Sequence, residues 1–300
     1  MEAIKLESII VECNHINKNF GGFCLKDITF AFPAGYILGL VGANGSGKTT
    51  LIHMLLGLYQ ADSGYIHIFD KSYQDREMSI KEQIGFVLQD DLFYKHLNLY
   101  HNACHFGEKY KNFDNKKFVE YCRQFGLNER TVYYKLSKGE QLKFQLAFAL
   151  SYNPKLLILD EATGNFDLAF RAEFQKLMTA FIQDGLHSVI FSSHVFDEME
   201  RIADYILFMD KGEAVLYMDR ESIIQEYRII CGEHYKINNL PSQNIIYREG
   251  NKEEVKALVK YSKYDTYDKE LTVKNVTISD FIYYYMAARK AGKIGKGGQA

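Results

Sequence analysis

A glycine-rich loop near the N-terminus has the residue types and spacing that bind polyphosphates. Residues 42–49 read Gly-Ala-Asn-Gly-Ser-Gly-Lys-Thr, a glycine followed by four residues and then Gly-Lys-Thr. In such a loop the backbone N–H groups converge on a phosphate chain, the lysine reaches the terminal phosphates, and the threonine hydroxyl ligates magnesium. The loop therefore predicts a nucleoside triphosphate site whose contacts are Gly42, Asn44, Gly45, Ser46, Gly47, Lys48, Thr49 and Thr50.

The segments on both sides of the loop supply the strand and the helix that this motif needs. Residues 36–41 form a short apolar run, which predicts a buried strand. After the loop, apolar residues recur at helical spacing at Leu51, Met54, Leu55 and Leu58. A helix that begins at the loop points the positive end of its dipole at the phosphates.

Two acidic residues follow a second apolar strand. Residues 156–159 are all aliphatic, and Asp160 and Glu161 come directly after them. Opposite a phosphate loop, Asp160 would hold magnesium through water and Glu161 would orient the attacking water. The alternative, two solvated acids at a strand end, is disfavoured by the nearby loop. A third such strand, residues 189–193, delivers His194 to the same edge.

Other motifs are weaker when each is taken alone. In residues 8–32 apolar side chains occur at alternate positions, as in antiparallel strands, with a turn at Gly21-Gly22. Phe20 directly precedes that turn. Phe20 could stack on an adenine ring, although composition alone favours a core position. An alternating strand is expected at 64–69 and a buried strand at 84–88, the second ending at Gln89, and helical spacing follows from 99 to about 130. Ser137, with Glu140 three residues later, predicts a capping box at a helix start.

Composition and charge limit the possible functions. The 300 residues are 47% hydrophobic, which supports a sizeable core, and the formal net charge of −2 gives no polyanion-binding signature. The five cysteines form no Cys-x-x-Cys pair, as expected for reduced thiols in the cytosol. We expect no signal peptide, because the first residues are polar and include Glu2 and Glu7. We expect no membrane span, because no run of 18 apolar residues exists. If the chain serves a membrane, a partner must span it.

The segment from Arg220 onward differs from the rest of the chain. It carries 14 Lys/Arg against 10 Asp/Glu and repeats none of the motifs above. We expect a small α+β appendage over residues 221–290, followed by a disordered Gly/Lys-rich tail at 291–300. The pattern predicts strands at 233–237, 245–248 and 271–273, and helices at 252–261 and from Ser279.

The motifs taken together, in this order, closely resemble those of an ABC-type ATPase subunit. The resemblance rests on the glycine loop, Gln89, the Leu-Ser-Lys-Gly-Glu-Gln stretch at 136–141, Asp160-Glu161 and His194, and it covers residues 1–220. It implies an α/β P-loop NTPase domain over 1–220, with an antiparallel β subdomain and a helical subdomain at about 90–150. ATP and Mg²⁺ are the cofactors that it implies.

The resemblance also implies a role for each residue at the expected nucleotide. Phe20 matches the aromatic residue that stacks on adenine, which reverses the preference from composition. Gln89 matches the glutamine that touches magnesium and links to the transmembrane partner. The catalytic residues would be Lys48, Gln89, Glu161 and His194, and the magnesium site would be made by Thr49, Gln89 and Asp160.

Three further matches concern a second ATPase protomer. Ser137 and Gly139 match signature residues that bind the γ-phosphate held by the opposite protomer, and residues 164–167 match a loop that crosses the dimer interface. The family's second-position signature glycine is Lys138 here, and its glutamine is Glu140. The interface loop reads Gly-Asn-Phe-Asp instead of Ser-Ala-Leu-Asp. Neither change removes a catalytic group, so we expect a working ATPase.

The leading prediction is the ATPase subunit of a membrane exporter, similar to bacterial type-2 ABC exporters. An importer subunit, a soluble ABC ATPase of translation or DNA metabolism, and a regulator without turnover are the alternatives. The expected partners are an integral-membrane permease and a second, identical or different ATPase subunit, with no nucleic acid. The permease would hold the chain at the inner face of the cell membrane. Its helix should dock between Gln89 and His105, where apolar and aromatic residues cluster.

Overall fold

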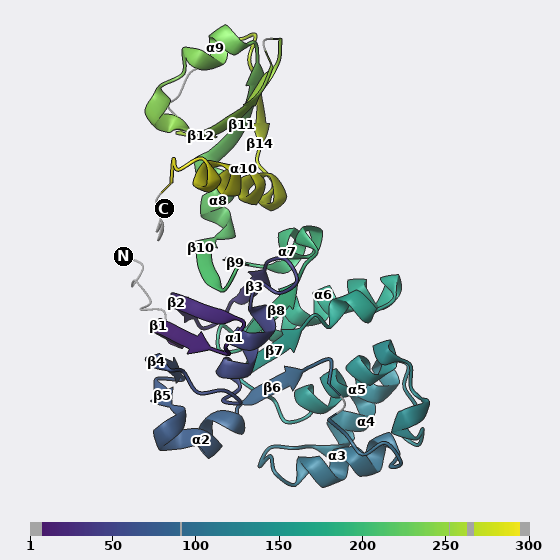
Figure 1. Ribbon diagram of the computed structural model, residues 1–300. Coiled ribbons are helices and arrows are strands. Elements are labelled where there is room, and N and C mark those ends of the chain that lie inside the picture. The colour runs from purple at the N-terminus through teal and green to yellow at the C-terminus, as the bar shows by residue number, and fades with distance from the viewer. Residues whose placement is uncertain (1–7, 91, 252, 263–266, 295–300) are drawn as a thin grey trace, which may run out of the picture. The chain divides into compact units, whose positions relative to one another are not determined.

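The chain folds into two compact units. The computed structural model describes residues 8–90, 92–251, 253–262 and 267–294 (Figure 1). One unit comprises residues 1–194 and 209–214, and the other comprises residues 195–208 and 215–300. Every motif named above lies in the first unit.

Four antiparallel strands form one part of the first unit. They are β1 (Ile9–Asn19), β2 (Cys24–Pro33), β4 (Ser63–Ile68) and β5 (Lys71–Ser72), in the order β5-β4-β1-β2. Cys13 of β1 pairs with Phe30 on one side and with Ile66 on the other. The alternating side chains bury one face, as the sequence of residues 8–32 predicts.

Four parallel strands position the chemical residues. They are β3 (Ile37–Val41), β8 (Ser188–Ser193), β7 (Leu156–Asp160) and β6 (Ile84–Val87), in the order β3-β8-β7-β6. β3, β7 and β8 are buried along their whole length, as is usual for parallel strands covered on both faces. Parallel strands end at a common edge. The glycine loop, the two acids and His194 therefore come to the same place.

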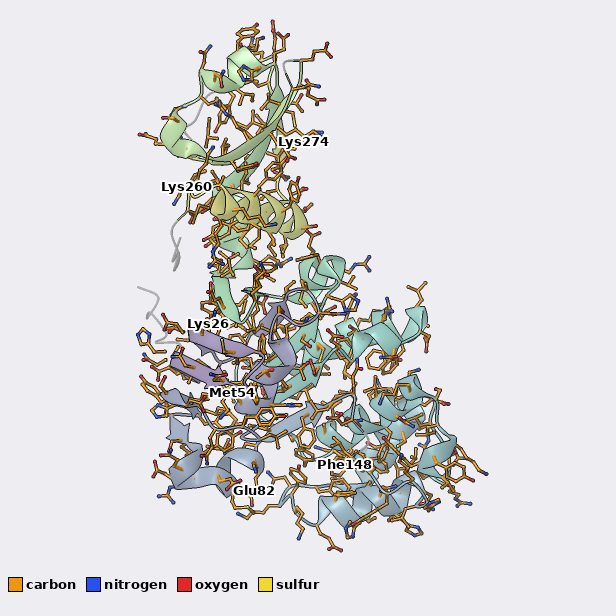
Figure 2. The ribbon with its side chains drawn as sticks, in the orientation of Figure 1. Lys26, Met54, Glu82, Phe148, Lys260 and Lys274 are labelled. Carbon is orange, nitrogen blue, oxygen red and sulfur yellow. The ribbon has the colours of Figure 1, made fainter. Side chains whose placement is uncertain are left out.

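Helices accompany these strands. The first unit contains α1 (Lys48–Leu55), α2 (Tyr73–Lys81) and α6 (Leu168–Phe181), with short 3₁₀ turns η1 (Tyr133–Lys135) and η2 (Thr163–Asn165). The segment from 99 to 130, expected to be helical, forms two helices, α3 (Leu99–Gly107) and α4 (Asn115–Gln124). The second helix starts anew at Asp114, whose side chain caps it. Together with α5 (Lys138–Leu150) they enclose an aromatic core that includes Phe93, Phe144 and Phe148 (Figure 2).

The second unit is built on a four-stranded antiparallel sheet. Its strands are β11 (Tyr227–Gly232), β12 (Ile245–Gly250), β13 (Val255–Lys260) and β14 (Thr272–Asn275), in the order β12-β13-β11-β14. Its helices are α7 (Phe196–Ile202), α8 (Arg220–Glu226), α9 (His234–Asn238) and α10 (Ile278–Lys290), with a 3₁₀ turn η3 (Ser242–Asn244). Strands β9 (Tyr205–Asp210) and β10 (Glu213–Asp219) are divided between the two units.

Two secondary-structure predictions for this unit are wrong. The helix expected at 252–261 is strand β13, although residue 252 itself lies outside the described residues. Val255, Ala257 and Val259 alternate into one core cluster, and the additional burial of Leu258 gave the segment a misleading helical spacing. The strand expected at 233–237 is helix α9, whose Ile237 joins the same cluster.

Other predictions for this part of the chain are confirmed. Strands β12 and β14 and helix α10 lie within two residues of the expected positions. Within the described ranges, no helix is long and apolar enough to cross a membrane. The tail expected to be disordered, 291–300, falls mostly outside the described residues.

Candidate active site

The glycine loop has two positions that only glycine can occupy. Gly47 adopts a left-handed φ of 109° at the N-cap of α1, and a Cβ there would lie 2.6 Å from a Leu25 methyl carbon. A Cβ on Gly42 would lie 2.3 Å from the Met209 carbonyl oxygen. Between them, the buried Ser46 Oγ has no hydrogen-bond partner among the described residues. The loop thus presents a buried hydroxyl beside exposed backbone at Asn44 and Gly45, which fits a phosphate chain.

Lys48 is buried and folds back over the loop. Its side chain is 4% exposed. The Nζ atom donates hydrogen bonds to the carbonyl oxygens of Gly42 at 2.8 Å and Ala43 at 3.3 Å. The same atom lies 3.4 Å from Glu161 Oε1. A buried cation that faces only carbonyls and one carboxylate is well placed to neutralise an anionic ligand.

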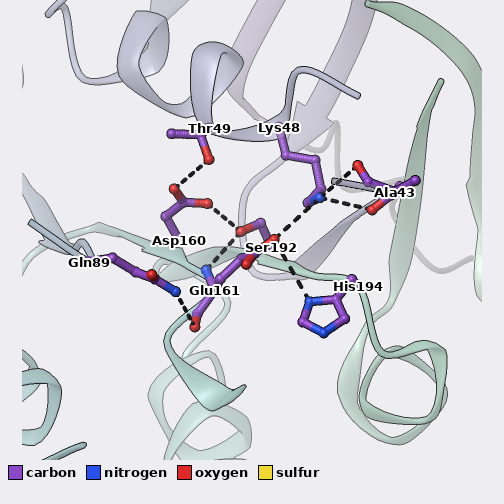
Figure 3. Close-up of polar contacts among 9 residues, drawn as sticks. Ala43, Lys48, Thr49, Gln89, Asp160, Glu161, Ser192 and His194 are labelled. Carbon is purple, nitrogen blue, oxygen red and sulfur yellow. Dashed lines mark hydrogen bonds and ion pairs between the residues drawn. The ribbon is translucent and has the colours of Figure 1, made fainter. Parts of the chain in front are cut away.

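Asp160 is held from two sides (Figure 3). It is 6% exposed at the end of β7. Its Oδ2 accepts a hydrogen bond from Thr49 Oγ1 at 2.8 Å, and its Oδ1 accepts one from Ser192 Oγ at 2.6 Å. The carboxylate and hydroxyl oxygens brought together here are the ligand type that Mg²⁺ prefers.

Glu161 has an unusual backbone conformation. Its φ of 45° lies in the left-handed region, which costs a non-glycine residue about 1–2 kcal/mol. The backbone N–H donates to Ser192 Oγ at 2.9 Å, and the carbonyl oxygen accepts from Gln89 Nε2 at 3.3 Å. The carboxylate, 26% exposed, lies 3.8 Å from His194 Nδ1. The strained backbone therefore directs this carboxylate toward Lys48 and His194 (Figure 3).

Most of these groups line one cleft of about 590 Å³ within the first unit, whereas Gly42, Ser46 and His194 are not among its lining residues. This volume is in the range of small-molecule and cofactor sites. Thus the sheet edge brings together the glycine loop, the loop glutamine and the two acids, as the sequence predicts. The lining residues are Phe23, Asn44, Gly45, Gly47, Lys48, Thr49, Thr50, His53, Leu88, Gln89, Asp90, Asp160 and Glu161.

Phe20 is not a core residue, contrary to the preference from composition alone. Its side chain is 43% exposed, and its ring packs edge-to-face on Tyr59 with centroids 5.2 Å apart. However, the aromatic ring that lines the cleft is Phe23, and His53 of α1 lines it as well. Sequence reasoning missed both as site residues. The available signals were the position of Phe23 just beyond the Gly21-Gly22 turn and that of His53 one helical turn after Thr49.

Ser137 and Gly139 do not line the cleft; they lie at the start of α5. Ser137 and Glu140 form the predicted capping box, and hydrogen bonds from Ser137 lower the pKa of the Glu140 carboxyl. A Cβ at Gly139 would lie 2.6 Å from the Asn165 carbonyl oxygen, so no other residue fits there. Position 138, in contrast, accommodates a long side chain. The Lys138 ammonium donates a hydrogen bond to the Gln89 carbonyl oxygen.

The segment at 164–167 is anchored at its end. Phe166 is buried, with its ring centroid 4.7 Å from that of Phe170. Asp167 caps α6 by accepting from the Phe170 N–H and forms an ion pair with Lys143 at 2.9 Å. Both contacts lower the pKa of the Asp167 carboxyl, and the hydrogen bond from the Phe170 N–H contributes the most.

Comparison with known proteins now assigns the chain. The family model described as "ABC transporter" matches residues 25–164. The ABC transporter ATP-binding protein YhcH of Bacillus subtilis is 31% identical over 210 residues, covering 69% of this chain and 68% of that protein. The chain belongs to the ABC transporter ATP-binding family. The predicted ABC-type ATPase is therefore confirmed at the level of the family.

Other relatives of this ABC-family chain match over a smaller share of their own length. YdbJ of Bacillus subtilis is 31% identical over 193 residues, covering 63% of this chain and 62% of YdbJ. The sulfate/thiosulfate import ATP-binding protein CysA of Ralstonia nicotianae is 32% identical over 216 residues, covering 68% of this chain and 57% of CysA. The match thus spans less than two thirds of the length of these two relatives.

Solved structures confirm the predicted fold class. The ATP-binding subunit of an ABC transporter has a TM-score of 0.67 at 22% identity, covering 71% of this chain and 91% of that structure. The ATP-binding cassette MJ0796, solved as a dimer with ADP and Pi, has a TM-score of 0.63 at 21% identity. The match covers 70% of this chain and 98% of that structure. The chain therefore has the mixed α/β P-loop fold of ABC ATPases.

Two buried polar residues beside the ABC-family motifs, Ser192 and Gln145, belong to none of those motifs. Ser192 bonds to both acids, as described above. Gln145 of α5 accepts a hydrogen bond through its side-chain oxygen from the Leu88 N–H at 2.8 Å. Two side chains of α5 thus bond to the main chain around Gln89. Gln145 accepts from the Leu88 N–H, and Lys138 donates to the Gln89 carbonyl oxygen. No sequence pattern marks these two contacts, because they depend on how distant elements pack.

Proposed function

We propose that this chain is the ATP-binding and ATP-hydrolysing subunit of an ABC membrane transporter. The observation that carries the proposal is the Glu161 carboxylate, which lies 3.4 Å from the Lys48 amine in a cleft that also holds the Thr49–Asp160 pair. A cation for phosphates, an oxygen-ligand pair for magnesium and a carboxylate for water thus share one site. The family membership and the glycine loop support ATP as the ligand.

In this proposal each residue acts through its own chemistry. The loop amides and Lys48 bind the phosphates, while Thr49, Asp160 and Gln89 hold magnesium. When bound, Mg²⁺ neutralises charge on the phosphate oxygens. Glu161 accepts a proton from the attacking water, and His194 stabilises that arrangement from the other side of the carboxylate. A positioned general base of this kind contributes roughly 10²–10⁴-fold to the rate.

The proposed site is completed by a second ATPase subunit. Ser137 is exposed and lies outside the cleft, so it is free to meet a nucleotide held by another protomer. Gly139 and Asn165 touch within one chain, and we propose that the signature residues and the loop at 164–167 face the partner together.

A membrane permease is the second proposed partner. Near the loop glutamine, Tyr94, Leu97, Tyr100 and Tyr134 are exposed large side chains that we propose as its docking surface. Phe93, expected from sequence to belong to this surface, instead packs inward, with ring centroids 4.6 Å from Phe144 and 5.0 Å from Phe106. Docking on this surface would place the chain at the inner face of the cell membrane.

We propose export as the direction of transport, on the resemblance of the chain to bacterial type-2 ABC exporters. Import is the second candidate, because relatives such as CysA are named import ATP-binding proteins. The proposed domains remain 1–220 for the ATPase and 221–290 for an accessory domain. Transport into or out of vesicles containing the permease would decide the direction.

Hydrolysis and binding test the central proposal. Purified chain is assayed for Mg²⁺-dependent phosphate release and for binding of a fluorescent ATP analogue, beside Lys48→Ala. We expect the wild-type chain to do both and Lys48→Ala to do neither. Absence of ATP binding by the folded wild-type chain would refute the proposal.

A further inference from the structure

One buried hydroxyl connects the two acidic residues of the site. Ser192 is 1% exposed near the end of β8. Its Oγ donates a hydrogen bond to Asp160 Oδ1 at 2.6 Å and accepts one from the Glu161 N–H at 2.9 Å (Figure 3). A serine hydroxyl has one donor and two acceptor positions. Its only proton is therefore committed to Asp160.

The position of this hydroxyl is set by strand register. Asp160 and Ser192 are direct partners in the parallel β7–β8 pair. The two side chains therefore project from neighbouring strands toward the same face. No rearrangement of a loop is needed to form the contact, and none can easily break it while the sheet is intact.

The two hydrogen bonds have different consequences. At Asp160, the bond to Oδ1 fixes the carboxylate plane and leaves Oδ2 for Thr49 Oγ1. At Glu161, the bond satisfies the N–H of a residue with φ of 45°, a conformation that needs support because it is strained. Both acids would be less well oriented without the hydroxyl.

We propose that Ser192 is a positioning residue of the active site. Its single hydroxyl sets the direction of the Asp160 carboxylate and stabilises the left-handed backbone of Glu161. Ser192 itself touches neither the nucleotide nor the metal in this proposal. The proposal rests on the proposed function, because it assigns these acids to magnesium and to water. Groups that orient metal ligands in this way typically change metal affinity or activity by about 10–100-fold when removed.

Two substitutions and a matched control test the proposal. Ser192→Ala removes the hydroxyl, and Ser192→Cys keeps the size while hydrogen-bonding weakly. The control is Ser188→Ala, because Ser188 lies on the same strand, is fully buried and accepts a hydrogen bond from the Gly35 N–H at 2.9 Å. The measurements are kcat and KM for ATP, thermal melting, and binding of a fluorescent ATP analogue during titration with Mg²⁺.

Both Ser192 variants should lower kcat and raise the Mg²⁺ midpoint by ~10–100-fold. Binding of the analogue without Mg²⁺ should stay within about twofold of wild type, because Lys48 and the loop are intact. Ser188→Ala should lower the melting temperature and leave kcat and the Mg²⁺ midpoint unchanged.

Three results would overturn the proposal. One is a Ser192→Cys protein with wild-type kcat and Mg²⁺ midpoint. Another is a Ser188→Ala protein that reproduces the losses, since the effect would then be general destabilisation. The third is weakened binding without Mg²⁺. If the wild-type chain binds the analogue but does not hydrolyse ATP, the proposed function fails while the Mg²⁺ midpoint still decides the role of Ser192.

Discussion

Replacing Glu161 by glutamine separates nucleotide binding from hydrolysis. Glutamine keeps the shape of the side chain and has the same backbone preferences at φ of 45°, so the fold should be unchanged. It cannot take a proton from water. The expected loss in kcat is ~10²–10⁴-fold, which corresponds to ~2.7–5.4 kcal/mol of transition-state stabilisation at 1.36 kcal/mol per tenfold.

Binding should survive this change. Lys48 loses the carboxylate at 3.4 Å but keeps the carbonyl oxygens of Gly42 and Ala43. The buried Lys48 ammonium therefore keeps two hydrogen-bond acceptors, and the loop should stay folded. The loop amides, Thr49 and Asp160 remain. We therefore expect the variant to retain ATP and to accumulate as an ATP-bound dimer.

The assay combines phosphate release with size-exclusion chromatography in ATP and Mg²⁺. A shift from monomer to dimer is expected for Glu161→Gln if one protein supplies both halves, and no shift is expected for Lys48→Ala. Hydrolysis near the wild-type rate in Glu161→Gln would refute the assignment of Glu161. Loss of turnover in a protein that stays monomeric would indicate a different ATPase subunit as the partner.

Four further substitutions test other parts of the chain. Phe20→Ala should weaken ATP binding roughly ten- to a hundredfold, because stacking on a base is worth ~1–3 kcal/mol; equilibrium binding measures this. Gly139→Ala should lower the melting temperature, because its Cβ would lie 2.6 Å from a carbonyl oxygen. Leu97→Glu should keep the fold and release the chain from permease-containing membranes, whereas Phe93→Glu should unfold the helical part, as large losses in an aromatic core cost about 3–5 kcal/mol.

Each of these substitutions has a control or a contradicting result. Phe23→Ala is compared with Phe20→Ala, and if only the first weakens binding, Phe23 is the base platform. Lys138→Gly should melt near the wild-type temperature, because its exposed ammonium makes one solvent-accessible hydrogen bond. Membrane association that survives Leu97→Glu would place the docking surface elsewhere.

The parts of the site that are local in sequence could be predicted. The glycine loop and the Asp160-Glu161 pair each directly follow an apolar strand, so their chemistry and their place at a sheet edge can be inferred from neighbouring residues. The α/β fold follows from the same buried parallel strands. The same reasoning succeeds for β1 and β2, whose alternation is long enough to be unambiguous.

Contacts between distant elements could not be predicted. Ser192 meets Asp160 because of the β7–β8 register, which no single segment encodes. Phe23 lines the cleft, although the motif match points to Phe20 as the aromatic residue at the base. In the second unit, the segments of α9 and β13 are five and six residues long, too short for periodicity to decide between helix and strand. In both segments, packing against the rest of the second unit determines whether a helix or a strand forms.

The second unit is discontinuous in sequence, and this has a practical consequence for domain recombination. The chain passes between the units three times, after residues 194, 208 and 214. A single cut near residue 220 therefore leaves part of the second unit attached to the first. Helix α7 would remain, while α10, whose Ile278 N–H donates to Glu200 Oε1 at 2.6 Å, would be lost. A transplant of this unit into another ATPase must therefore carry two separate segments, residues 195–208 and 215–300.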